Sequence, residues 1–202
     1  MFARLQMENE MARIGNCLAR AWRKIAGWDF RPALVAATCV LTVGSLLTFY
    51  WEAQAADRDE ILRGKYLVTQ GLCTDCHTPG YFFGKPDAAR FLGGSEVGFE
   101  IPGLGVFHGP NLTPDNETGL GTWSKQDIVT VLRTGVRPDG RELAPIMPWR
   151  AFAELTEGDR EAIAAYLKSV PAVSNKVPGP FGPTETPTSF VFKVVPPAAP
   201  SN

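Results

Sequence analysis

One stretch in the first quarter of the chain is apolar and carries no charge. Residues 33–51 read ALVAATCVLTVGSLLTFYW, without an aspartate, glutamate, lysine or arginine. As a helix rising roughly 1.5 Å per residue, this stretch covers almost 30 Å, which matches the hydrocarbon core of a bilayer. The pattern predicts a single transmembrane anchor over 33–51.

Charge on the two sides of this stretch predicts its orientation. Residues 1–32 contain six basic and three acidic side chains, a net charge of +3, whereas the whole chain has −1, which leaves −4 for the remainder. Because basic segments stay on the cytoplasmic side, we expect a cytoplasmic N-terminus and a periplasmic remainder at a bacterial inner membrane. A cleaved signal peptide is the alternative, because Ala53-Gln54-Ala55 resembles a cleavage site. The long basic segment before the apolar core favours a retained anchor.

Beyond the anchor, three stretches show apolar residues at helical spacing. They are 57–70, 124–134 and 157–170. Ser124 begins the second and Thr156 directly precedes the third, and each is followed three positions later by aspartate, as in a capping box. Gly64 interrupts the first stretch, and a glycine there predicts close contact with another helix. Gly135 follows the second as a natural stop.

Two further segments lack such periodicity. Residues 78–116 are rich in glycine, and residues 174–202 form a proline-rich tail that we expect to extend over the surface or to engage a partner. Pro145 to Trp149 reads as an extended segment, since two of its five residues are proline. The chain thus divides into 1–32, the anchor at 33–51, one compact domain at 57–173, and the tail.

The candidate chemistry lies between the first two helical stretches of this domain. Cys73-Thr74-Asp75-Cys76-His77 is a C-x-x-C-H motif, the pattern that attaches a c-type haem. On a helical turn, the two thiols are placed to add to the porphyrin vinyl groups, and the histidine supplies an iron ligand. A redox-active pair or half of a zinc site also uses C-x-x-C. Zinc lacks a second half here, because the other cysteines, Cys17 and Cys39, lie in or before the anchor, and no βαβ pattern surrounds the motif.

A haem ligated by His77 has one axial position left. Met147 is the one methionine that follows the predicted anchor, and Pro145 and Pro148 restrict the backbone beside it. Ligation by His77 and Met147 raises the potential of a haem iron. His108 is the competing ligand, and we favour its interpretation as a loop histidine near the haem edge. Nothing in the composition indicates a nucleic-acid partner.

Together these motifs resemble a class I c-type cytochrome. Their order is most similar to that in the haem domains of cytochrome c subunits of bacterial periplasmic dehydrogenases. The residues that carry the resemblance are Cys73 to Thr78, Asn111 to Asp115, Gly121 to Ser124, Asp127-Ile128, Leu132 to Gly135, Met147 to Trp149, and Ala162 to Leu167.

The resemblance implies an all-α class I cytochrome c fold, in which several short helices surround one covalently bound haem c. It implies that the helix before Cys73 crosses the last helix near Gly64 and Tyr166. Further residues acquire roles through it. Cys73 and Cys76 attach the haem, His77 and Met147 ligate iron, the Pro110 carbonyl orients His77, and Trp123 lies near a haem propionate.

The function implied is that of a membrane-anchored monohaem electron carrier rather than an enzyme. Its partners would be periplasmic or membrane redox complexes of a respiratory chain: a quinol–cytochrome c oxidoreductase, a terminal oxidase or a dehydrogenase. Both a tethered shuttle and a fixed subunit agree with the sequence. The related dehydrogenase subunits usually carry three haem domains, whereas this chain has one haem motif. The alternative is a haem enzyme or gas sensor with an open or displaceable sixth ligand.

Overall fold

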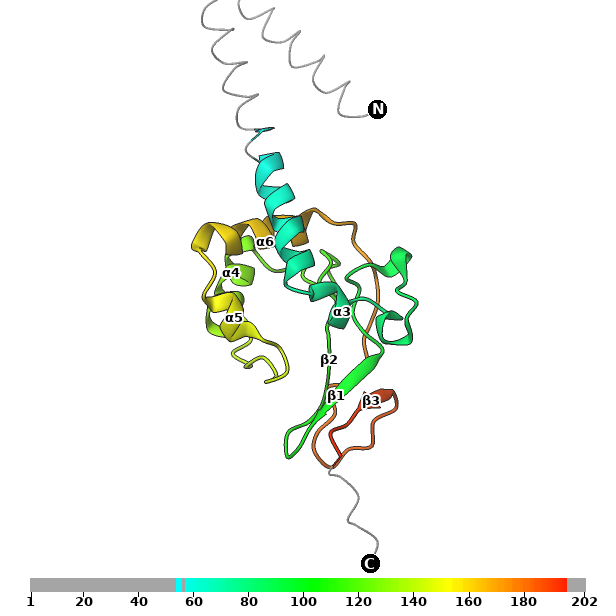
Figure 1. Cartoon of the computed structure of the whole chain (residues 1–202). Coiled ribbons are helices and arrows are strands. Elements are labelled where there is room, and N and C mark those ends of the chain that lie inside the picture. The colour runs from blue at the N-terminus through cyan, green and yellow to red at the C-terminus, as the bar shows by residue number, and fades with distance from the viewer. Residues whose placement is uncertain (1–53, 56, 196–202) are drawn as a thin grey trace, which may run out of the picture. The chain divides into compact units, whose positions relative to one another are not determined.

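A computed structural model describes residues 54–55 and 57–195, which belong to one compact unit (Figure 1). The predicted anchor at 33–51 and the basic segment at 1–32 lie outside the described residues. Within the described part, no helix is long and apolar enough to cross a membrane. The elements are a helix over 57–70, α3 (Cys73–His77), the 3-10 turns η1 (Tyr81–Phe83) and η2 (Ala88–Arg90), β1 (Val97–Ile101), β2 (Gly105–His108), α4 (Lys125–Thr134), α5 (Trp149–Ala153), α6 (Glu157–Ser169) and β3 (Phe190–Phe192).

Local signals begin and end α4 and α6, as the sequence predicts. Ser124 and Asp127 form a complete capping box at the start of α4, and Gly135 ends the helix with a φ of 72°. The Thr156 hydroxyl accepts a hydrogen bond from the Asp159 amide at the start of α6. Each cap provides partners for backbone groups that a helix end leaves unpaired.

The helix over 57–70 crosses α6 at Gly64. A Cβ atom at Gly64 would overlap the carbonyl oxygen of Ala162, so the predicted close contact is confirmed. Around this crossing lies the main core. Its members come from these two helices, from α4 and α5, and from Leu92 and Leu120: Val68, Leu92, Leu120, Ile128, Val129, Leu132, Phe152, Ile163, Ala164 and Leu167. We call the helix over 57–70, α4, α5 and α6 the helical region.

The expectation of an all-α fold is wrong in one respect, because the described residues include a three-stranded sheet of order β2-β1-β3. β1 and β2 form an antiparallel hairpin in which Phe99 pairs with Phe107, and β3 joins β1 in parallel, with Val97 opposite Phe190. The strands are short, and β3 is drawn from the proline-rich tail. No period-2 pattern long enough to predict them exists in the sequence. Several short helices are present, as expected.

The tail folds back along the segment that follows α3. Phe181 exchanges two backbone hydrogen bonds with Val106, at 2.9 and 3.0 Å. Further along, Phe192 packs against Phe82 and Phe99, with ring centroids 5.1 and 5.6 Å away. We call residues 78–108 together with 174–195 the sheet region; β3 and the hairpin lie beside each other in Figure 1. The tail therefore contributes a strand to this unit.

Candidate functional site

The C-x-x-C-H motif forms its own short helix, α3, immediately after the helix over 57–70. Leu72 separates the two helices in the left-handed conformation, with a φ of 54°, and is directly preceded by Gly71. A Cβ atom at Gly71 would lie 2.9 Å from the Phe152 ring. The turn therefore redirects the chain close to the core and presents both cysteines and His77 from one helical turn.

The ring of His77 is buried and held by a backbone carbonyl. Nδ1 lies 2.7 Å from the carbonyl oxygen of Pro110. Because a carbonyl only accepts, Nδ1 is the protonated nitrogen and donates, which leaves the lone pair on Nε2. Burial lowers the pKa of His77, and the Pro110 hydrogen bond opposes this only in part. The imidazole is thus kept neutral, the form in which histidine binds a metal.

The backbone around Pro110 approaches α3 so closely that it requires a glycine. A Cβ atom at Gly109 would overlap the carbonyl oxygen of Cys76. On the other side, the Gly94 amide donates to the His77 carbonyl at 2.8 Å, and the Ser95 amide donates to the Gly109 carbonyl at 2.9 Å. His77 is therefore fixed by two neighbouring backbone segments, 94–95 and 109–110.

Both thiols in the motif are free and partly buried. Burial raises the pKa of the Cys73 thiol to about 11 and is also the main cause of the raised pKa of Cys76. Redox-active and metal-binding cysteines act as thiolates and have lowered pKa values. Among the described residues, no group of three or more histidine, cysteine or carboxylate side chains is placed to hold a metal ion. The raised pKa values of the two thiols argue against a thioredoxin-like pair.

Three of the predicted site residues border the same core. Cys73, Trp123 and Met147 are partly buried and pack against the main core cluster. The guanidinium of Arg137 lies over the Trp123 ring, 5.1 Å from its centroid. Lys168 donates to the carbonyls of Leu120, Gly121 and Trp123 at 2.8 to 3.0 Å, so α6 anchors the loop that presents Trp123.

His108 lies on β2 and contacts the tail, rather than lying on a loop. Its Nε2 is 2.8 Å from the Ser189 hydroxyl, and its ring packs edge-on against Phe181 at a centroid distance of 5.9 Å. His108 thus joins two parts of the sheet region. The loop assignment is wrong because β1 and β2 pair in this segment.

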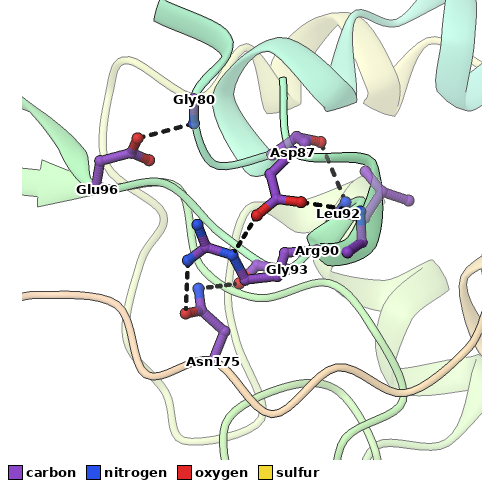
Figure 2. Close-up of polar contacts among 9 residues, drawn as sticks. Gly80, Asp87, Arg90, Leu92, Gly93, Glu96 and Asn175 are labelled. Carbon is purple, nitrogen blue, oxygen red and sulfur yellow. Dashed lines mark hydrogen bonds and ion pairs between the residues drawn. The ribbon is translucent and has the colours of Figure 1, made fainter. Parts of the chain in front are cut away.

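Side chains from the segment that follows α3 and from the tail form a hydrogen-bond network around residues 80–96 (Figure 2). Glu96 accepts from the Gly80 amide at 2.8 Å, and Asp87 pairs with Arg90 at 2.8 Å. Asn175 of the tail donates to the Gly93 carbonyl at 2.7 Å and also contacts Arg90. This network adjoins Gly94 and so supports the backbone that holds the His77 carbonyl.

Comparison with known proteins places this geometry in a family. The sequence model described as Cytochrome c matches residues 61–171, which is more than half of the chain. The chain belongs to the cytochrome c family. Membership implies a covalently bound haem c, and the matched residues run from the helix before α3 to the end of α6.

Several relatives of this cytochrome c are subunits of larger complexes. The chain is 35% identical over 142 residues to the cytochrome c subunit of an alcohol dehydrogenase (quinone) of Gluconobacter oxydans, over 67% of this chain and 28% of the relative. It is 34% identical over 117 residues to the fructose dehydrogenase cytochrome subunit of Gluconobacter japonicus, covering 56% and 23%. A diheme cytochrome c-type protein of Cereibacter sphaeroides is 39% identical over 127 residues, covering 60% and 38%. The chain therefore spans about a quarter of the length of the first two relatives.

The residues of the site fit a haem c. Within the described residues, Nε2 of His77 has no hydrogen-bond partner while Nδ1 is engaged, and both thiols are unpaired. Because Gly109 has no side chain, the backbone there can lie directly against the carbonyl of Cys76 in α3. Sequence reasoning did not identify Gly109, Arg137 or Asn175 as parts of the site. Only Gly109 had a signal, its position beside Pro110, because the other two act across long separations in the chain.

Proposed function

We propose that this cytochrome c is a membrane-anchored monohaem carrier of single electrons on the periplasmic side of a bacterial inner membrane. The observation that carries the proposal is the His77 site: a buried, neutral imidazole in a C-x-x-C-H helix, with Nδ1 bound to the Pro110 carbonyl and Nε2 free. A bound haem supplies one-electron exchange at its iron.

The chain's own residues have distinct tasks in this proposal. Cys73 and Cys76 would attach the haem covalently, and His77 and Met147 would ligate its iron. Burial of His77 and Thr78 excludes water from the proximal side. Trp123 would lie near a propionate, and Arg137 over its ring would supply a positive charge there. Because His77 and Met147 would both be iron ligands, electron transfer is favoured over substrate chemistry.

Three sequence features support the finer parts of the proposal. One C-x-x-C-H motif occurs in the 202 residues, which favours a single haem. The uncharged stretch at 33–51 favours a retained anchor, and the basic residues before it favour a cytoplasmic N-terminus. The names of the relatives favour a redox complex with a dehydrogenase as partner. Anchoring would raise the local concentration of the carrier at such a complex.

Spectroscopy on the full-length chain, expressed in a host that attaches haem c, tests the haem site. We expect one haem per chain, covalently retained under denaturing conditions, and the near-infrared band of methionine-ligated ferric haem. Met147→Ala should abolish this band and lower the potential, whereas His108→Asn should leave the band in place. Rapid binding of carbon monoxide by the reduced wild type would contradict a carrier and support the gas-sensor alternative.

Fractionation tests the anchor and the partner. The full-length chain should sediment with membranes and require detergent for release, and a variant lacking residues 1–51, directed to the periplasm by a substitute signal peptide, should be released by osmotic shock. Proteins that co-purify from detergent-solubilised membranes are then identified. A dehydrogenase subunit in stoichiometric amount supports a fixed subunit. If no dehydrogenase subunit co-purifies and the carrier still passes electrons to an added oxidase, the result supports a tethered shuttle.

A further inference from the structure

A buried arginine lies on α6 without an acidic partner. Arg160 is 8% exposed, and no carboxylate forms an ion pair with it among the described residues. Its Nη1 donates to the carbonyl of Ala153 at 2.9 Å and to that of Leu155, and its Nε is buried without a hydrogen-bond partner. Burying a charge is unfavourable unless it is paired or hydrogen-bonded, so the two carbonyl acceptors offset much of the cost of burying Arg160.

The first of these carbonyls belongs to the last residue of α5, and the second lies two residues beyond the helix. A helix of five residues cannot be stable by itself, and its last carbonyls have no partners within the helix. Its N-cap residue, Pro148, provides no side-chain hydrogen bond. Two contacts therefore hold α5 in place. Phe152 is buried in the core, and the guanidinium of Arg160 donates hydrogen bonds at the C-terminal end of the helix.

α5 in turn determines where Met147 lies. Met147 comes two residues before the helix begins, and the Trp149 amide donates to the Met147 carbonyl at 2.8 Å. We call residues 136–148, which connect α4 to α5 and contain Met147, the methionine segment. It begins after Gly135, whose carbonyl accepts a hydrogen bond from the Leu143 amide at 2.8 Å. The Trp149 ring lies against Gly135, where a Cβ atom would overlap it. Contacts at Gly135 thus hold the start of the methionine segment, and Arg160 holds α5, which follows its end.

We propose that Arg160 is a positioning residue for Met147: by binding the end of α5, it keeps the thioether at the iron in the ferric protein. This inference rests on the proposed function, because it requires Met147 to be a haem ligand. The ion pair between α6 and the helix over 57–70 is formed by Asp159 with Arg63 and does not involve Arg160. Its effect is directed to the methionine segment.

The test compares ligand exchange in haem-loaded, full-length variants. In Arg160→Met, imidazole should displace Met147 from the ferric haem about tenfold faster or more than in wild type, the scale of one charge-assisted hydrogen bond. The near-infrared band should weaken at equilibrium. Arg160→Lys, which keeps the charge and some of the donors, should fall between the two and remains informative should Arg160→Met not fold.

Lys168→Met is the matched control, because Lys168 lies on the same helix and also binds backbone carbonyls, but those of 120–123 rather than of α5. Unfolding free energies are measured for all variants. Equal acceleration of imidazole binding in Lys168→Met and Arg160→Met at equal stability loss would show a general destabilisation and overturn the inference. Unchanged exchange in both Arg160 variants would also overturn it while leaving the proposed function intact. A wild type without the near-infrared band would refute Met147 ligation, and with it this inference and the ligand assignment in the proposed function.

Discussion

The helical region and the sheet region are stabilised by contacts of different range. In the helical region, caps such as Ser124 with Asp127 and stripes of apolar residues act within a few positions of each other. In the sheet region, Val106 pairs with Phe181 and Val97 with Phe190. The comparison teaches that two halves of one small domain can differ in how much of their structure is encoded locally, and that the haem site draws on both.

The two regions also support different sides of the proposed haem site. Met147 and Trp123 border the core of the helical region. His77 is held by Pro110 and Gly94, whose surroundings belong to the sheet region and its tail. Damage confined to one region should therefore affect one axial ligand first, and the following predictions test this separation.

The largest effect is expected at the helix crossing. Gly64→Ala forces a methyl group into the Ala162 carbonyl, so we expect a loss of about 3 kcal/mol or more in unfolding free energy. Gly158→Ala is the matched control, since Gly158 lies in α6 and a Cβ atom there meets nothing within 4 Å. It should be neutral or stabilising by up to about 1 kcal/mol. Chemical denaturation measures both, and similar losses would show that the crossing is not tightly packed.

Removal of the tail should separate the two regions. A chain ending at Val173 lacks β3 and the Phe181 and Asn175 contacts, so amides in 97–108 should lose protection from hydrogen exchange. Amides in α4 and α6 should keep theirs. Hydrogen exchange of these amides is measured by mass spectrometry on the haem-loaded protein. Equal loss of protection in α4 and α6 would mean that the regions unfold as one unit.

Two single hydroxyls allow a closer comparison. Ser124→Ala removes the cap of α4 and should cost about 1 kcal/mol. Ser189→Ala leaves His108 Nε2 without its partner and should cost a similar amount, about 1 kcal/mol. The first should raise hydrogen exchange in α4 and the second in β2. The same pattern of exchange in both variants would contradict the separation.

The smallest effect is expected from pH. The pKa of Asp127 lies below its ordinary value because the Ser124 hydroxyl and amide donate to it, and that of Asp87 is lowered by Arg90. The unfolded chain therefore binds protons first as pH falls, so both carboxylates contribute stability at neutral pH that is lost on acidification. Asp127→Asn and Asp87→Asn should each flatten the decline in stability between neutral pH and about pH 3. Unfolding curves across this range provide the measurement, and an unchanged decline would exclude the carboxylate as a contributor.

Local signals predicted the helical region well but left out its shortest element. The C-x-x-C-H motif, both caps and the close contact at Gly64 follow from residues near one another. Only the first residue of α5, Trp149, lies in the segment predicted to be extended, and residues 150–153 carry no strong helical pattern of their own. The α5 anchor, Arg160, could not be predicted, because a buried arginine and an exposed one look alike in sequence.

Non-local pairing explains what the sequence could not predict in the sheet region. The three residues of β3 lie among prolines and glycines, and only their contact with β1 makes them a strand. His108 gave no sign that it would contact Ser189. The Pro110 carbonyl was predicted to orient His77 only through a family resemblance, and the structure shows that hydrogen bond.

The parallel pairing of β3 with β1 has a consequence for solubility. An unpaired edge of a sheet is a template for strands of other chains. Until residue 192 is synthesised, one edge of β1 is unpaired. Its partner β3 is far away in sequence, and pairing between such distant segments forms slowly. The completed edge is then β3, only three residues long, and the sequence places Pro196 and Pro197 shortly after it. A short strand next to residues without an N–H offers little for another chain to extend, so the tail protects the domain from edge-to-edge aggregation.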